Sequence, residues 1–279
     1  MGVRENLEFP LRNEGLARGE IDRRIAEVAA ILRIEHLLDA RIGGLSGGDR
    51  QRVALGRAIV RQPKAFLMDE PLGTLDAEFR ELMCVELRRL HDRLKTTTVF
   101  VTHDQNEAMA LADHIVVMNQ GEILQSDTPE GVYNFPSCLF VARFIGRPAM
   151  NLLPLDEPVT ADRDTVRVAG TAVTVPRPRA SVQRALLGVR PEHVSLRPAG
   201  EGIPARVAQV EYFGSHWVAS LATAAGNVCA LVGKEDAPTV GDAVGITFDA
   251  WRAVLFDASS EQLIPSAATL ARHAEKHHV

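Results

Sequence analysis

Three short stretches of this 279-residue sequence hold side chains whose types and spacing suit phosphate chemistry. The first is Leu-Ser-Gly-Gly-Asp-Arg-Gln-Arg, from Leu45 to Arg52. Ser46 is a typical N-cap for a predicted helix from Gly47 to about Arg61, and the glycines at its start leave backbone N–H groups open at the positive end of that helix. Such an end binds phosphate, and the alternative interpretation is an ordinary helix cap.

Two adjacent carboxylates form the second stretch. Asp69 and Glu70 follow the apolar run Ala65–Met68, which predicts a short strand buried on both faces. The carboxyl end of such a strand is the usual ligand edge of a parallel sheet. Asp69 is placed there to hold Mg²⁺ through water, as a Walker B aspartate does, and Glu70 to polarise an attacking water as general base. The alternative is a solvated acidic turn before Pro71.

The third stretch is a histidine beyond a second predicted strand. His103 follows the β-branched run Thr97–Thr102. From the end of that strand its ring could reach a γ-phosphate as a hydrogen-bond donor. A lone histidine is usually structural, so His103 gains its meaning from the other two stretches.

The elements that position these residues follow from the hydrophobic pattern. Helical and strand patterns alternate up to about residue 146, which predicts a parallel α/β sheet. A long helix is expected over 77–95, and a strand over 114–118 is followed by a turn and a return strand.

The sequence changes character near residue 150. Short β-rich segments broken by Pro and Gly replace the helical pattern from about Asn151, as in a small all-β barrel or sandwich. Arg147–Ala149 is a plausible linker. We therefore predict an α/β part over 1–147, a β part over 148–265 and a flexible tail over 266–279.

Composition excludes several classes of protein. The hydrophobic fraction is 46% and the net charge is −5, without the basic excess of a nucleic-acid binder. No apolar run approaches the ~18 residues that cross a bilayer. The three cysteines are too far apart for a zinc knuckle or a disulfide framework. We expect a cytoplasmic protein that does not bind nucleic acid.

Taken together and in this order, the stretches resemble the motifs of the ATP-binding-cassette (ABC) transporter ATPases. The matching series is Leu-Ser-Gly-Gly, Asp-Glu-Pro, Leu-Asp at 75–76 and Thr-His-Asp, and the likeness covers residues 3–149. The stretch Leu187–His193 resembles the C-terminal regulatory barrel, of the TOBE type, of importer ATPases. Phe140–Gly146 and Met150–Leu153 resemble the carbohydrate, polyol and glycerol-phosphate importers.

The resemblance implies a fold and a function. The fold is a partial P-loop NTPase (ABC) domain with a parallel sheet and a helical subdomain, followed by a small OB-like (TOBE) barrel. The function is an ATP-hydrolysing subunit, with ATP and Mg²⁺ as cofactors, that powers import of a sugar, polyol or glycerol phosphate. The implied partners are membrane-spanning permease subunits, a second ATPase subunit and, indirectly, a solute-binding protein. The implied location is peripheral, on the inner face of the cell membrane.

The resemblance also divides the residue roles between two subunits. Glu70 and His103 would be catalytic at this chain's own nucleotide, Asp69 would hold Mg²⁺ through water, and Asp76 would couple the two sites. The partner's nucleotide would be bound by the signature residues Leu45, Ser46, Gly47, Gly48 and Asp49. Asp49 stands where the family usually has Gln or Glu, and it brings negative charge toward that phosphate.

One family motif is missing from this sequence. A P-loop, G-x-x-x-x-G-K-[ST], needs a lysine after glycine. Of the four lysines, only Lys234 follows glycine, and Glu235 and Val228 stand where the motif requires Ser or Thr and its first Gly. The family's Q-loop glutamine and adenine-stacking aromatic are also absent. We therefore expect the chain alone to bind ATP weakly and to hydrolyse it negligibly.

Three explanations fit an N-terminally truncated cassette: a true start upstream of Met1, a decayed gene, or a half-site partner of a complete subunit. The first two are favoured, because the third requires an incomplete core to fold. A non-catalytic regulator that docks through the barrel is a further alternative. An oligonucleotide-binding barrel is disfavoured by the acidic charge and the few aromatic residues.

Overall fold

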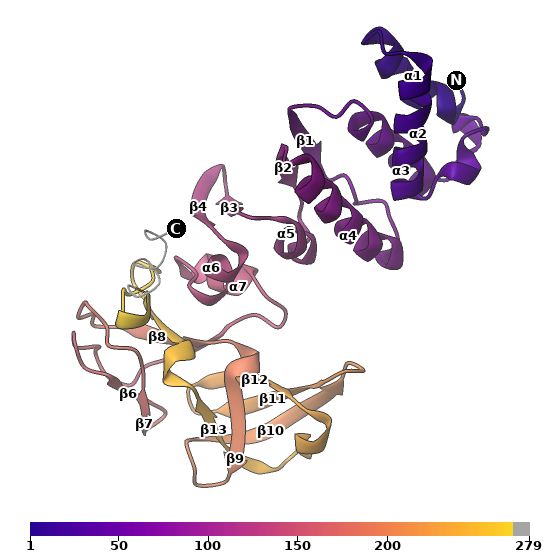
Figure 1. Ribbon diagram of the computed structural model, residues 1–279. Helices are drawn as coiled ribbons and strands as arrows, with labels where there is room; N and C mark the ends of the chain where they lie inside the picture. Colours follow the sequence, from indigo (N-terminus) through magenta and orange to yellow (C-terminus); the bar gives the residue numbers. More distant parts are fainter. Residues whose placement is uncertain (270–279) are drawn as a thin grey trace. The chain divides into compact units, whose positions relative to one another are not determined.

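The computed structural model describes residues 1–269 (Figure 1). Packing divides the chain into two compact units, the first formed by residues 1–113 and the second beginning at residue 114. The first unit holds all of the predicted phosphate-handling residues. The second is mainly β structure.

The first unit is built largely from helices. They are α1 (Val3–Asn13), α2 (Arg18–Leu32), α3 (Gly47–Ile59), α4 (Ala77–Leu94) and α5 (Gln105–Leu111), with short 3-10 turns at Glu35–Leu37 and Ile42–Gly44. The start of α3 and the extent of α4 agree with the sequence predictions to within about two residues at each end. Residues from α1, α2, α3 and α4 share one apolar core, which fixes α3 and so the signature stretch at its N-terminus.

A glycine permits the close packing of α3. A Cβ atom on Gly56 would lie 2.9 Å from Leu32 Cδ1, 3.2 Å from Leu7 Cδ2 and 3.3 Å from Val28 Cγ1. A larger residue would therefore push α3 away from α1 and α2.

Two parallel strands cross the first unit. β1 (Ala65–Asp69) pairs with β2 (Thr97–Val101), with Ala65 opposite Thr97 and Asp69 opposite Val101. The expected parallel pairing is confirmed, and it brings the carboxyl ends of both strands to one edge.

The prediction that β1 is buried on both faces is wrong. Phe66 is buried in the helical core, whereas Leu67 is 83% exposed and Val99 on β2 is 52% exposed. Side chains alternate across a strand, and within residues 1–269 this sheet contains only β1 and β2. One face packs on the helices, and the other presents apolar side chains to solvent.

The second unit opens with a hairpin and two short helices. β3 (Ile115–Asn119) and β4 (Glu122–Asp127) are antiparallel, as predicted, and are joined by a tight turn with positive φ angles at Gln120 and Gly121. The helices are α6 (Pro129–Asn134) and α7 (Leu139–Phe144).

The remainder of the second unit is all β, in agreement with the predicted fold class. One sheet has the strand order β12-β11-β10-β13-β9, a second has the order β14-β8-β5, and β6 and β7 form a hairpin. The strands are β5 (Asn151–Pro154), β6 (Thr165–Val168), β7 (Thr171–Thr174), β8 (Ala185–Val189), β9 (Val194–Pro198), β10 (Ile203–Tyr212), β11 (Trp217–Thr223), β12 (Gly226–Val232), β13 (Ala243–Phe248) and β14 (Ala253–Asp257).

A buried arginine ties α6 and α7 to the β strands. Arg190 is 1% exposed, and its guanidinium donates to the backbone carbonyls of Tyr133 (2.7 Å from Nη2), Ala142 (3.4 Å) and Ile145. It also lies 4.1 Å from the centre of the Tyr133 ring. Burial lowers the pKa of Arg190, and the three carbonyls compensate part of its lost hydration.

The packing groups residues 114–147 with the β-rich part, so the proposed domain boundary near residue 147 stays a prediction. Leu139 and Ala142 of α7 share a core with Phe256 of β14. In the predicted tail, Ser266 and Thr269 are buried and hydrogen-bonded to each other. The rest of that tail, 270–279, lies outside the described residues.

Candidate nucleotide site

The signature stretch forms a capped helix start. Ser46 is the N-cap of α3, and its Oγ accepts a hydrogen bond from the Asp49 backbone N–H at 3.1 Å. The same hydroxyl donates to Asp49 Oδ2 at 2.7 Å, and Asp49 also pairs with Arg52. The Ser46 hydroxyl, assisted by Arg52, holds the pKa of the Asp49 carboxyl below its ordinary value. The serine hydroxyl is therefore engaged by Asp49.

The backbone of this helix start is open. A Cβ atom placed on Gly47 would meet no atom within 4 Å, whereas one on Gly48 would lie 3.6 Å from Leu75 Cδ2. Leu45, just before the cap, is half-buried against the helical core. A phosphate oxygen can thus approach the first amides of α3 from the Gly47 side.

The two predicted catalytic side chains meet at the carboxyl edge of the β1–β2 pair. His103 Nδ1 lies 3.0 Å from Glu70 Oε1. Both side chains are accessible, with 75% of His103 and 53% of Glu70 exposed. The register explains the meeting, because Asp69 and Val101 pair at the ends of the strands and the two functional residues follow one and two positions later.

The backbone of Glu70 is unusual. Its φ is +44°, a left-handed conformation that non-glycine residues seldom adopt. Its N–H donates to the Val101 carbonyl at 2.9 Å, and its own carbonyl accepts from the Gly73 N–H at 3.2 Å. The chain therefore turns sharply after β1, and Asp69 ends the strand as an exposed carboxylate.

Asp76 has a clear local role. It is the N-cap of α4, and its Oδ1 accepts from the Phe79 N–H at 2.9 Å. The loop before it, at Leu75, lies against Gly48 of the signature helix. The structure thus places the signature helix, the acidic turn and the Asp76 cap side by side within the first unit.

A polar cluster that the sequence reasoning missed holds the residues on either side of His103. Glu107 is 4% exposed and accepts a hydrogen bond from Thr102 Oγ1 at 2.6 Å. Arg80 lies 3.5 Å from Glu107 and 3.4 Å from Asp104, and it donates to the Leu75 carbonyl at 2.9 Å. The residues before and after His103 are therefore tied to the start of α4.

A second missed residue is Gln51, one turn into α3. Its side-chain amide reaches both ends of the loop from Glu70 to Thr74. Gln51 carried no local signal, because its partners lie 19 to 23 residues away in the sequence, and the acidic partner Asp104 of Arg80 lies 24 residues away. Glu107 could have been singled out as the acidic residue in the first turn of α5.

The described residues fit part of the predicted nucleotide site. Within residues 1–269 there is no group of three or more His, Cys, Asp or Glu side chains that could hold a metal ion by themselves. A single carboxylate such as Asp69 is sufficient to contact a hydrated Mg²⁺ that is also bound by substrate phosphates. The open backbone at Gly47 leaves room for one phosphate. The sequence contains no P-loop for the phosphates of the chain's own nucleotide.

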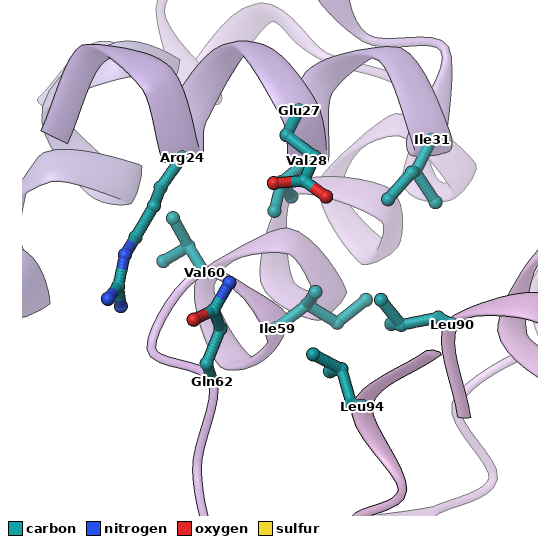
Figure 2. Close-up of a pocket in the computed structure, with 9 residues that line it drawn as sticks. All are labelled: Arg24, Glu27, Val28, Ile31, Ile59, Val60, Gln62, Leu90 and Leu94. Atoms are coloured by element: carbon teal, nitrogen blue, oxygen red, sulfur yellow. The ribbon is translucent and has the colours of Figure 1, made fainter. Parts of the chain in front are cut away.

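A small depression in the first unit is unrelated to these residues (Figure 2). The two charged residues on its rim are already paired, Arg24 with Glu20 at 2.7 Å and Glu27 with Arg93 at 2.6 Å. Its lining residues are Arg24, Glu27, Val28, Ile31, Ile59, Val60, Gln62, Leu90 and Leu94. None of the predicted site residues lines it. Separately, no helix within residues 1–269 combines the length and apolar character needed to cross a membrane.

Two segments of the chain match known protein families. Residues 1–73 match the ABC transporter family, and residues 187–256 match the TOBE domain. The solved structure of cbiO1 from Clostridium perfringens, part of the ABC transporter complex cbiONQ, is 29% identical, with a TM-score of 0.43 over 47% of this chain and 52% of that one.

Curated relatives are similar over longer stretches. The sn-glycerol-3-phosphate import ATP-binding protein UgpC of Yersinia pestis is 41% identical over 263 residues, which cover 93% of this chain and 73% of that protein. The protein of the same name from Chromobacterium violaceum is 42% identical over 96% of this chain and 73% of its own length. UgpC 3 of Rhizobium johnstonii is 54% identical over 71% of this chain, and that match spans 56% of its length. The chain belongs to the ATP-binding proteins of ABC importers.

Proposed function

We propose that this chain is the ATP-hydrolysing, energy-coupling component of an ABC importer for a sugar, polyol or glycerol phosphate. The names of its relatives favour sn-glycerol 3-phosphate among these solutes. The observation that carries the proposal is the 3.0 Å contact between His103 and Glu70 at the carboxyl edge of the two parallel strands.

In this proposal Glu70 is the general base. Its carboxylate accepts the proton of the attacking water, and the His103 ring orients it through the Nδ1 contact. With Nδ1–H donating to Glu70, the second ring nitrogen donates to a phosphate oxygen when the ring carries a proton on both nitrogens. ATP supplies the transferable phosphoryl group, and Asp69 would hold a hydrated Mg²⁺, which when bound would neutralise the charge that develops on the phosphate.

The signature helix serves a partner's nucleotide. Ser46, Gly47 and Gly48 present backbone amides and the helix dipole to an anion, and Asp76 couples the two sites through the start of α4. The partners are a second ATPase subunit and membrane-spanning permease subunits, with a solute-binding protein reached indirectly. The chain would then work peripherally, on the inner face of the cell membrane, without nucleic acid.

A half-site function is the second candidate. The signature end of α3 is formed, whereas the 279-residue sequence holds no P-loop to cradle the chain's own nucleotide. The chain alone is therefore expected to hydrolyse ATP negligibly, and it could still lend its signature end to a complete subunit.

Mixing with a complete relative tests the half-site candidate. The relative would carry a disabled signature serine, so that its own ATPase activity is lost. Adding this chain should restore phosphate release, because the chain supplies the missing helix start. The Ser46→Arg variant should fail to restore it, and the Glu70→Gln variant should restore it normally, since Glu70 serves the other site. No restoration by the wild-type chain would contradict the half-site role.

A further inference from the structure

The side-chain amide of Gln51 closes the loop that carries Glu70. Its Nε2 donates to the Glu70 carbonyl at 3.2 Å, and its Oε1 accepts from the Thr74 backbone N–H at 3.1 Å. The Thr74 hydroxyl also donates to Oε1. One side chain thus holds the first and the last residue of the turn that follows β1.

Glu70 needs such support, because its backbone is strained. A left-handed φ of +44° on a residue with a Cβ atom persists only where the surroundings fix it. The Val101 carbonyl fixes the N–H of Glu70, and the Gly73 N–H and the Gln51 amide fix its carbonyl. The Val101 carbonyl belongs to β2, whereas the Gln51 amide comes from helix α3 and so ties Glu70 to the signature helix.

We propose that Gln51 is a positioning residue for Glu70, and that through it the signature helix and the loop of Glu70 move as one unit. Gln51 lies one turn beyond Ser46 and Gly47, the residues assigned above to a partner's nucleotide. A displacement of that helix end is therefore transmitted to the carboxylate that contacts His103. The functional meaning rests on the proposed function of Glu70 and Ser46, whereas the mechanical link rests on the contacts alone.

A glutamine suits this position because it donates and accepts at once. The isosteric change Gln51→Glu keeps an acceptor for Thr74 and removes the donor to the Glu70 carbonyl. Gln51→Ala removes both. Arg50→Ala is the matched control, since Arg50 is the exposed neighbour on the same helix. Because Gln51 is not part of the buried core, both variants should fold, and circular dichroism checks this.

Two readouts on the 279-residue chain test the link without ATP. Gln51→Ala should speed the amide exchange of Thr74 by about tenfold, the effect of losing one modest hydrogen bond. Gln51→Ala and Gln51→Glu should both move the His103 ring-nitrogen NMR signals toward those of Glu70→Gln. Arg50→Ala should leave both readouts unchanged. A merely structural role would loosen Thr74 and leave the His103 signals in place, which would overturn the proposal.

A double-mutant cycle adds an independent check. Glycine adopts a positive φ without the cost of a Cβ atom, so Glu70→Gly removes the strain that Gln51 opposes. Gln51→Ala should then speed the exchange of the Gly73 amide less in the Glu70→Gly background than in the wild type. Equal effects in both backgrounds would contradict the positioning role. If these results hold and no assembly hydrolyses ATP, the link stands and the proposed function fails.

Discussion

The strands of the two units differ in how completely they are buried. In the second unit, β8 and β14 are buried almost throughout, with Leu187 and Phe256 fully covered. In the first unit, β1 covers Phe66 and leaves Leu67 exposed. The β-rich unit buries both strands and its arginine, Arg190, whereas the unit to which we assign the phosphate chemistry keeps an open sheet face and an accessible His103–Glu70 pair. Stability and chemistry are therefore expected to respond to different substitutions.

The largest effect should come from the buried arginine of the second unit. Arg190→Ala leaves three backbone carbonyls without their donor and opens a cavity, so unfolding should become easier by about 3–5 kcal/mol. Urea denaturation followed by circular dichroism measures this. Arg197→Ala, at an exposed position, is the control. An equal loss of unfolding free energy in both variants would contradict the stabilising role assigned to the buried Arg190.

Substitutions at two neighbouring positions on β1 should differ in their effect on the unfolding free energy. Phe66→Ala should lower the unfolding free energy by about 3 kcal/mol, because the substitution removes a large side chain from the packed core. Leu67→Ser, one residue on, should change the unfolding free energy by less than about 0.5 kcal/mol, because that side chain already faces solvent. A large loss from Leu67→Ser in the same denaturation assay would show that its face of the sheet is covered in solution.

Asp49 makes the stability of the first unit depend on pH. Its pKa is lowered in the folded state, so its contribution is present above the ordinary carboxyl pKa and disappears as the pH falls through the lower folded value. Asp49→Asn should therefore cost about 0.5–1 kcal/mol at neutral pH and progressively less under acid conditions. Asp39→Asn, at an exposed position, is the control. A cost that stays constant with pH would contradict the assigned charge effect.

A small effect on stability is also expected from the pair proposed to be catalytic. Since both side chains are more than half exposed, His103→Gln should change the unfolding free energy by less than about 1 kcal/mol. A loss comparable with that of Arg190→Ala would mean that His103 acts mainly as a structural residue.

Much of this arrangement could be predicted from local sequence. Ser46 before two glycines gave the start of α3, and the apolar run 65–68 gave the strand that ends at Asp69. Parallel pairing of that strand with 97–101 then brought Glu70 and His103 to one edge. These features depend on neighbours in the sequence or on the general geometry of parallel sheets.

The parts that local sequence could not give depend on distant contacts. The exposure of Leu67 follows from how many strands the sheet has, which the run of apolar residues does not reveal. The amide of Gln51 acts on a loop 19 to 23 residues away, and Arg190 acts on carbonyls 45 to 57 residues away. The engagement of the Ser46 hydroxyl by Asp49 was close in sequence, yet only the side-chain geometry fixed it.

Phosphate release by the purified 279-residue chain tests the central claim most directly. The claim is that the first unit carries the general base but cannot hold its own nucleotide, since the sequence lacks a P-loop. The wild-type chain, incubated with ATP and Mg²⁺, should release no more phosphate than its Glu70→Gln variant. Turnover by the wild-type chain that disappears in the Glu70→Gln variant would contradict the claim, because it would require a complete site within this chain.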